Sequence, residues 1–249
     1  MPRKPKPTPQ TPPTEPVHDE PIGLLEHIEE LRRRLLISLV ALGIGTAAGL
    51  FVGERVVQFL TTPIGGLANL QSIEITENVG VFMRVSLLTG FVLALPVIFY
   101  QLLRFILRGL TPGETRGVLT AIPAAVILFL GGAAFSYYVM LPNAIPFLTQ
   151  FLGVETRPRL SNYINFITDL IFWMGISFEM PLLVFILAKF KIVTAKTLLK
   201  QWRYALIIIA VVAAVITPTV DPVNMALLMA PLLALYFLSI LFAAIANRK

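Results

Sequence analysis

The sequence predicts an all-α polytopic membrane protein whose six transmembrane helices are kinked by proline, form a concave cup and leave both chain termini in the cytoplasm. Three observations favour this fold class: a deficit of charge, a series of long apolar runs, and an uneven distribution of positive charges. Of the 249 residues, 56% are hydrophobic and only 14% are charged. A soluble domain carries about 25% charged residues, so this chain has too few to cover a water-facing surface.

Six apolar runs follow one another along the chain and define the expected spans. We expect these spans at about 35–53, 81–103, 117–141, 163–188, 204–219 and 223–246. A helix needs about 20 residues to cross a hydrocarbon core of ~30 Å, and most of the runs are near that length. The fifth run would reach only about 24 Å at 1.5 Å per residue. We therefore expect the bilayer to thin there, or neighbouring helices to shield its ends.

The spans belong to one domain that is flanked by short polar ends. Residues 1–21 contain eight prolines among Lys, Thr, Glu and Gln, a composition that cannot bury a core, so we expect a disordered cytoplasmic tail. Residues 22–246 form the six-helix transmembrane domain, with an amphipathic lead-in from Leu24 that continues into the first span. Residues 247–249 are the expected cytoplasmic C-terminus.

The positions of Lys and Arg predict the orientation of the spans. A model with the N-terminus inside places 16 of the 20 positive charges in cytoplasmic segments. The other four are Arg55, Arg84, Arg157 and Arg159. Because cytoplasmic loops are enriched in Lys and Arg, this asymmetry favours cytoplasmic N- and C-termini.

Composition excludes several classes of function. The chain has no cysteine and only two histidines, His18 and His27, both near the N-terminus, so no cofactor or metal site is expected. The sequence pI near 9.8 does not indicate nucleic-acid binding, because the basic residues flank apolar runs rather than cluster on a soluble domain. Metalloprotease and serine-hydrolase motifs and paired intramembrane aspartates are absent from the sequence, so we expect no enzyme.

Prolines lie within or at the ends of five runs and predict bent helices. They are Pro96, Pro123, Pro181, Pro218 and Pro231. Proline removes a backbone donor and kinks a helix, and so many kinks favour helices that enclose a concavity. Prolines are also simply commoner in membrane helices than in soluble ones, which is the alternative reading.

Two acidic residues lie inside the fourth apolar run. Glu179 is deep in the run, where an ionised group costs roughly 2.5 kcal/mol or more, so it should face protein or a water-filled recess. It either contacts a partner or substrate, or is a protonated glutamate that holds helices together. Asp169 lies ten residues earlier, about 80° away around the same helix, and its role stays open.

Charged residues crowd the start of the first helix. The spacing predicts surface ion pairs Glu29–Arg33 and Glu30–Arg34, each worth a few tenths of a kcal/mol. Glu114 lies in a short loop, Thr111–Arg116, between the second and third spans. Each of these residues alone is an ordinary surface group.

Together, the motifs resemble one family, the C subunit of the twin-arginine protein translocase (TatC). The resemblance covers about residues 24–246 and rests on ordered segments. These are 27–35 (His-Ile-Glu-Glu-Leu-Arg-Arg-Arg-Leu), Thr62-Pro63, 96–101 (Pro-Val-Ile-Phe-Tyr-Gln) with Phe105, Glu114 with Arg116, 178–181 (Phe-Glu-Met-Pro), and 217–222 (Thr-Pro-Thr-Val-Asp-Pro). The chain departs from the family pattern after Phe105, where a proline is usual, and at Met225 and Phe237.

The resemblance implies a set of site residues. Glu30 and Glu114 would bind the paired arginines of a signal peptide, since a guanidinium pairs bidentately with a carboxylate and an ammonium does not. Family positions that shape this recognition region match Arg32, Pro96, Phe105 and Leu110. Arg32 would orient Glu30 or the loop that carries Glu114. Glu179 would contact a polar group on a partner helix or the signal sequence, and Pro63 and Asp221 would shape the outer loops.

The resemblance also implies partners and a location. The expected function is a receptor and core subunit that binds twin-arginine signal peptides of folded cargo proteins. It would recruit TatA/TatB-type single-span subunits for export driven by the proton motive force, with other copies of itself in the assembly. The location would be the cytoplasmic (inner) membrane of a prokaryote. The alternative is a proton-coupled secondary transporter that uses Glu179 and Asp169, but the internal repeats typical of transporters are not evident in the sequence.

Overall fold

A computed structural model describes residues 24–106, 121–150, 157–216 and 222–247. Within these ranges all regular elements are helices. They are α1 (Leu24–Thr61), η1 (Thr62–Ile64), η2 (Leu67–Asn69), α2 (Glu77–Ile106), α4 (Ala121–Phe135), the π-helical η3 (Ser136–Met140), α5 (Leu141–Gln150), α6 (Leu160–Phe178), α7 (Met180–Lys189), α8 (Ala195–Lys200), α9 (Trp202–Ile216) and α10 (Pro222–Ala246). The expected tail at 1–21 lies outside the described residues.

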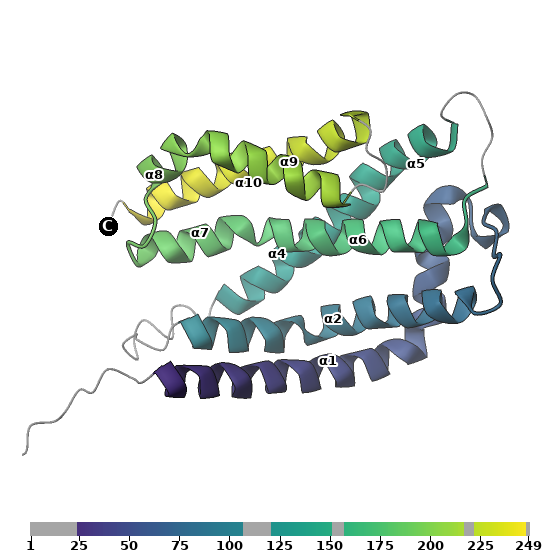
Figure 1. The fold of residues 1–249 in the computed structure, drawn as a ribbon, viewed down its shortest axis with the longest axis horizontal. Helices are drawn as coiled ribbons and strands as arrows, with labels where there is room; N and C mark the ends of the chain where they lie inside the picture. Colours follow the sequence, from purple (N-terminus) through teal and green to yellow (C-terminus); the bar gives the residue numbers. More distant parts are fainter. Residues whose placement is uncertain (1–23, 107–120, 151–156, 217–221, 248–249) are drawn as a thin grey trace, which may run out of the picture.

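The helices form a layered bundle with two well-defined ends. Figure 1 shows α1 and α2 antiparallel and side by side, α6 and α7 in one line next to α2, and α9 and α10 beyond α7. The α4–η3–α5 unit crosses this layer obliquely and packs mainly on α6. The "Arg34 end" is the end at which α1 begins and α2 ends, and the "Arg159 end" is the opposite one, where α2 and α6 begin.

The spanning units are long and apolar. Within the described residues, five helical units have the length and composition to cross a membrane: 26–64, 77–105, 121–149, 160–189 and 225–246. The apolar helix α9 is shorter, with 15 residues, or about 22 Å. Five long units and one short one agree with the order of the six expected spans.

The third unit continues beyond its expected end at 141 as far as Gln150. Pro142 does not end it, because the chain widens into the π-helical turn η3 just before that proline, and Leu141 N donates to Ser136 O. Asn143 Nδ2 then donates to Val139 O at 2.6 Å. In a membrane such local adjustments supply the bonds that a proline removes, so the helix persists.

The α1–α2 contact is made by glycines spaced four residues apart. A Cβ atom at Gly45 would lie 2.4 Å from Gly90 O, and one at Gly49 would lie 2.4 Å from Ser86 O. A Cβ atom at Gly53 would meet the Ser86 side chain at 2.7 Å. These residues form the small-residue stripe that lets membrane helices pack backbone to backbone.

A second close contact joins α4 to α6. A Cβ atom at Gly132 would lie 2.7 Å from Met174 O, and one at Gly175 would lie 2.5 Å from the Phe129 ring. Phe129 is fully buried and lies between Gly175 and the Phe91 ring, whose centroid is 5.7 Å away. This contact fixes the path of the oblique third unit across α6.

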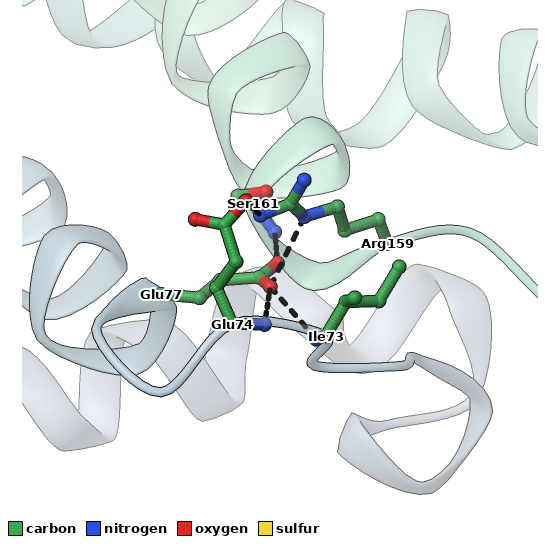
Figure 2. Close-up of polar contacts among 5 residues, drawn as sticks. All are labelled: Ile73, Glu74, Glu77, Arg159 and Ser161. Carbon is green, nitrogen blue, oxygen red and sulfur yellow. Dashed lines mark hydrogen bonds and ion pairs between the residues drawn. The ribbon is translucent and has the colours of Figure 1, made fainter.

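At the Arg159 end, a buried carboxylate joins the α1–α2 connection to the start of α6 (Figure 2). The Glu77 side chain is 1% exposed. Its Oε2 accepts hydrogen bonds from Ile73 N at 2.9 Å, Glu74 N at 3.3 Å and Arg159 Nε at 3.1 Å. Its Oε1 accepts one from Ser161 N at 2.7 Å. We call this group, Ile73, Glu74, Glu77, Arg159 and Ser161, the Glu77 clamp.

Two further contacts reinforce the clamp from the backbone and from a second acid. Arg159 also pairs with Glu74 at 2.8 Å, and the hydrogen bonds to Glu74 and then Glu77 raise the pKa of Arg159 above its ordinary value. A parallel bridge joins Gln71 to Arg159, with Leu160 N donating to Gln71 O at 2.8 Å. The clamp thus holds α2 and α6 in register at this end.

Candidate functional site

The Arg34 end contains a charged hollow between α1 and α2. Glu30 and Arg34, one turn apart on α1, form an ion pair in which Arg34 Nε donates to Glu30 Oε1 at 2.8 Å. Arg34 Nη1 also donates to Gln101 Oε1 on α2 at 3.2 Å. Both members of the pair are largely buried, so this is not the solvated surface pair that the spacing alone predicts.

The hollow has a volume of about 380 Å³ and carries charges of both signs. It is lined by Glu26, Glu29, Glu30, Arg33, Arg34, Ile37, Gln101 and Arg104. Three carboxylates and three guanidiniums therefore face the same space. Such a lining can exchange one guanidinium partner for another without leaving a carboxylate uncompensated.

Aromatic contacts place Phe105 beside this hollow. Its ring stacks on His27 of α1 with centroids 4.6 Å apart, and His27 lies one turn before Glu30. Arg104 Nη1 donates to Tyr100 Oη at 2.7 Å. The structure thus brings together Glu30 and Phe105, two of the residues singled out from the sequence, and adds Arg34 and Gln101 to them.

Other predicted residues are placed less centrally or lie outside the described ranges. Arg32 is exposed, and the Arg34 guanidinium contacts Glu30. Residues three and four positions apart share a helix face, whereas Arg32 is only two positions from Glu30. Pro96 lies within α2 and is exposed. Leu110 and Glu114 lie outside the described residues, as does the loop that Arg32 was alternatively expected to contact.

The second predicted pair at this end does not form. Glu29 and Arg33, both in the described part of α1, make no ion pair with each other, although Glu30 and Arg34 do. Glu30 and Arg34 face α2, where Gln101 fixes the guanidinium, whereas Glu29 and Arg33 are exposed. Exposed pairs gain little from a fixed geometry.

Glu179 lies at the break between α6 and α7. It is 3% exposed, and its backbone N–H donates to Ile176 O at the end of α6. Its side chain lies beside the backbone of Phe129. Its Oε1 atom has no hydrogen-bond partner among the described residues. A buried carboxyl oxygen in that state is available to a group from outside the chain.

Pro63, the predicted outer-loop residue that the structure describes, lies at the Arg159 end. Pro63 is half-buried and belongs to η1, which ends at Gly65 in a left-handed conformation (φ 89°). Tyr137 Oη donates to Phe59 O at 2.7 Å and Tyr163 Oη to Leu60 O at 3.1 Å, so the end of α1 before Pro63 is tied to the third and fourth units. Asp221 lies outside the described residues.

Sequence reasoning missed the Glu77 clamp and gave Asp169 no partner. Asp169 pairs with Arg84 of α2 at 2.6 Å. In both cases an acid or base at the edge of one span meets its partner at the edge of another. The sequence signal that remains is the presence of Glu77 and Arg159 at span ends on the same side. Within the described residues, no three His, Asp or Glu side chains are grouped as metal ligands would be.

The fold and these side chains define a polytopic membrane protein with a charged hollow at one end and a buried glutamate in its fourth span. Residues 26–231 match the family model of the Sec-independent protein translocase protein (TatC). The chain belongs to the TatC family, which makes it a component of a protein translocase rather than an enzyme.

Relatives and solved structures agree with this assignment. The chain is 34% identical over 236 residues to the TatC protein of Carboxydothermus hydrogenoformans, covering 94% of this chain and 97% of that one. It is 36% identical to the TatCy protein of Bacillus subtilis, covering 92% and 91%. A crystal structure of the twin-arginine translocase receptor TatC matches with a TM-score of 0.80 and 35% identity, over 90% of this chain and 100% of that one. The predicted all-α polytopic fold class is confirmed.

Proposed function

We propose that this chain is the receptor subunit of a twin-arginine translocase. It binds the signal peptides of folded cargo proteins and recruits TatA/TatB-type single-span subunits for export driven by the proton motive force. Membership of the TatC family supports the translocase role, and similarity to a structure described as the twin-arginine translocase receptor supports the receptor role. The transporter alternative is set aside, because the family is one of protein translocases.

The orientation that we propose has both termini in the cytoplasm of a prokaryotic cell, with the Arg34 end on the cytoplasmic side of the inner membrane. The basic residues of the described chain support this orientation. Arg32, Arg33, Arg34, Arg104 and Lys189 all lie near the ends of helices that meet there. Positive charge of this kind is retained on the cytoplasmic side, and a signal peptide arrives from that side.

The observation that carries the recognition proposal is the guanidinium of Arg34 on Glu30. The hollow at the Arg34 end already holds a carboxylate–guanidinium pair, half enclosed by α1 and α2. An arginine of the signal peptide has the same planar donor group as Arg34 and can share or replace it on the Glu30 carboxylate. A second arginine would meet Glu114, which the family resemblance assigns to the same task. Phe105 would form an apolar wall of the site.

Glu30→Ala and Glu114→Ala are each expected to weaken binding of a twin-arginine signal peptide by about tenfold or more, since each removes a charge-assisted hydrogen-bond acceptor. If the two carboxylates act as a unit, the double variant should bind the peptide only slightly less tightly than the single variant with the lower affinity. Site-specific crosslinking of the peptide to the full chain in membranes measures both effects.

Glu54→Ala is the matched control for this experiment. Glu54 is an exposed acid on the same helix but near the Arg159 end, so its removal changes the net charge equally and should leave crosslinking unchanged. Equal crosslinking of the peptide to wild type, Glu30→Ala and Glu114→Ala would show that neither carboxylate binds the signal-peptide arginines.

For Glu179 we propose a contact with a polar group on a partner helix. Burial and the absence of a partner for Oε1 within the described chain support this role. Glu179→Gln keeps a hydrogen-bonding group and is expected to retain most partner co-purification and transport, whereas Glu179→Ala should lose both by about tenfold. Ser136→Ala is the control, because Ser136 Oγ is also buried without a partner among the described residues. Normal assembly and transport by Glu179→Ala would show that the docking role is wrong.

A further inference from the structure

A hollow of about 330 Å³ opens between α1, α2 and α6, away from the Arg34 end and from Glu179. Its polar part is an ion pair between helices: Arg84 Nη2 lies 2.6 Å from Asp169 Oδ1, and Arg84 Nε donates to Thr168 Oγ1 at 2.7 Å. The Thr168 hydroxyl donates its proton to Ile164 O at 2.7 Å. Its oxygen is therefore left to accept the hydrogen bond from Arg84. Arg84 is therefore held in one orientation from two sides.

The pair is exposed although it lies within two spanning helices. The side chains of Arg84 and Asp169 are 37% and 45% exposed. Arg84 is the eighth residue of α2, and Asp169 is the tenth residue of α6, so they lie about 10 and 14 Å from the starts of these helices. Because α2, at about 45 Å, is longer than the ~30 Å hydrocarbon core, both charges are near the edge of the core facing the Arg159 end.

The rest of the hollow is apolar and lies deeper. Leu87, Leu88 and Phe91 follow Arg84 toward the bilayer centre, and Phe172 follows Asp169. Leu42 of α1 completes the lining. The hollow is thus charged near the membrane surface and apolar toward the bilayer centre. A phospholipid has the same arrangement, with its charged headgroup at the surface and its acyl chains inside.

The unused hydrogen-bonding atoms of the pair indicate which headgroup fits. Within the described chain, Arg84 Nη1 and Asp169 Oδ2 make no hydrogen bond, since the bonds of the pair use Arg84 Nε, Arg84 Nη2 and Asp169 Oδ1. A guanidinium binds phosphate, and a carboxylate binds an ammonium. We propose that this hollow binds one phospholipid whose headgroup carries both a phosphate and a primary amine, with an acyl chain along Leu87, Leu88 and Phe91.

A membrane helix from a partner fits the hollow less well. A single side chain on a partner helix offers one polar group, which can satisfy only one member of the pair. Arg84 and Asp169 present a positive and a negative charge near the membrane surface. The lipid satisfies both charges at once and covers the apolar walls.

Native mass spectrometry of the full chain tests the proposal. The protein is released from nanodiscs that contain phosphatidylethanolamine and phosphatidylglycerol in equal amounts, and the retained lipid is identified. We expect wild type to retain one phosphatidylethanolamine in preference to phosphatidylglycerol. Arg84→Gln should lower that retention by about tenfold, while Arg55→Gln, an exposed arginine near the same end, should leave it unchanged. Equal retention of the two lipids by wild type would overturn the proposal.

Two further variants separate lipid binding from a general loss of structure. Asp169→Asn keeps the phosphate partner and removes the ammonium partner, so it should erase the preference between the two lipids rather than the binding. Leu87→Trp fills the apolar part and should abolish retention, whereas Leu93→Trp, at an exposed α2 position outside the lining, should not. If Leu87→Trp and Arg84→Gln keep the lipid but lose crosslinking to a single-span helix, the hollow is a protein site and the lipid proposal is wrong.

Discussion

Replacing Gly49 with leucine is expected to prevent the native packing of α1 on α2. A Cβ atom at Gly49 would lie 2.4 Å from the carbonyl oxygen of Ser86. Because that oxygen belongs to a helix backbone, no side-chain rotation relieves the contact, and the two helices must separate. Arg34 on α1 would then lose its hydrogen bond to Gln101 on α2, so the charged hollow at the Arg34 end would be lost with the packing.

The expected effect is graded by side-chain size. Gly49→Ala should lower stability by about 1–3 kcal/mol, the usual range for overpacking, and Gly49→Leu should yield little folded protein. Size-exclusion profiles and thermal melts in detergent measure both. Gly43→Ala is the matched control, because nothing lies within 4 Å of a Cβ atom at Gly43. Equal losses at Gly43 and Gly49 would show that helix contact is not the cause.

Glu77→Ala is expected to cause the second large loss, by opening the Glu77 clamp. The substitution leaves Arg159 and three backbone N–H groups without their acceptor. The Arg159 side chain is 28% exposed and keeps Glu74 as a partner, so the loss comes mainly from the backbone N–H groups left without an acceptor. We therefore expect the melting temperature in detergent to fall by several degrees, and by more than in Glu74→Ala.

A neighbouring acid provides the control for the clamp. Glu74 pairs with the same arginine but its side chain is 63% exposed, so Glu74→Ala should cost about 1 kcal/mol or less. Glu77→Gln should lower Tm less than Glu77→Ala, because its amide oxygen can still accept the three hydrogen bonds made to Oε2, whereas its amide nitrogen cannot accept the one from Ser161 N. If Glu74→Ala lowers Tm as much as Glu77→Ala does, burial of Glu77 is not the source of the stability.

The spans were predictable because each depends on a local run of apolar residues. The short fifth helix illustrates this: α9 covers Trp202–Ile216, close to the run that the sequence marks at 204–219. The third helix continues past the apolar run at 117–141, because a π-helical turn carries the chain past Pro142, and the apolar pattern alone does not indicate such a turn. The glycine stripe at 45, 49 and 53 could have been predicted from its four-residue spacing, although its partner Gly90 could not.

The candidate site was predictable only where it is local. The Glu30–Arg34 pair follows from a spacing of four residues on one helix. Its burial and its link to Gln101 depend on how α2 packs on α1, which spacing does not reveal. The same holds for Glu77 with Arg159 and for Arg84 with Asp169, whose members are more than 80 residues apart in the chain. Such pairs require the relative placement of α2 and α6.

The central claim, that Glu30 binds an arginine of the signal peptide, is tested most directly by a double-mutant cycle. Affinities of an Arg-Arg peptide and a matched Lys-Lys peptide are measured for the wild-type chain and for Glu30→Gln in the same membranes. We expect wild type to prefer the Arg-Arg peptide by about tenfold or more, and Glu30→Gln to lose most of this preference, since the bidentate pair exists only when both groups are present. An Arg-Arg preference that is equally large in wild type and Glu30→Gln would contradict the assignment.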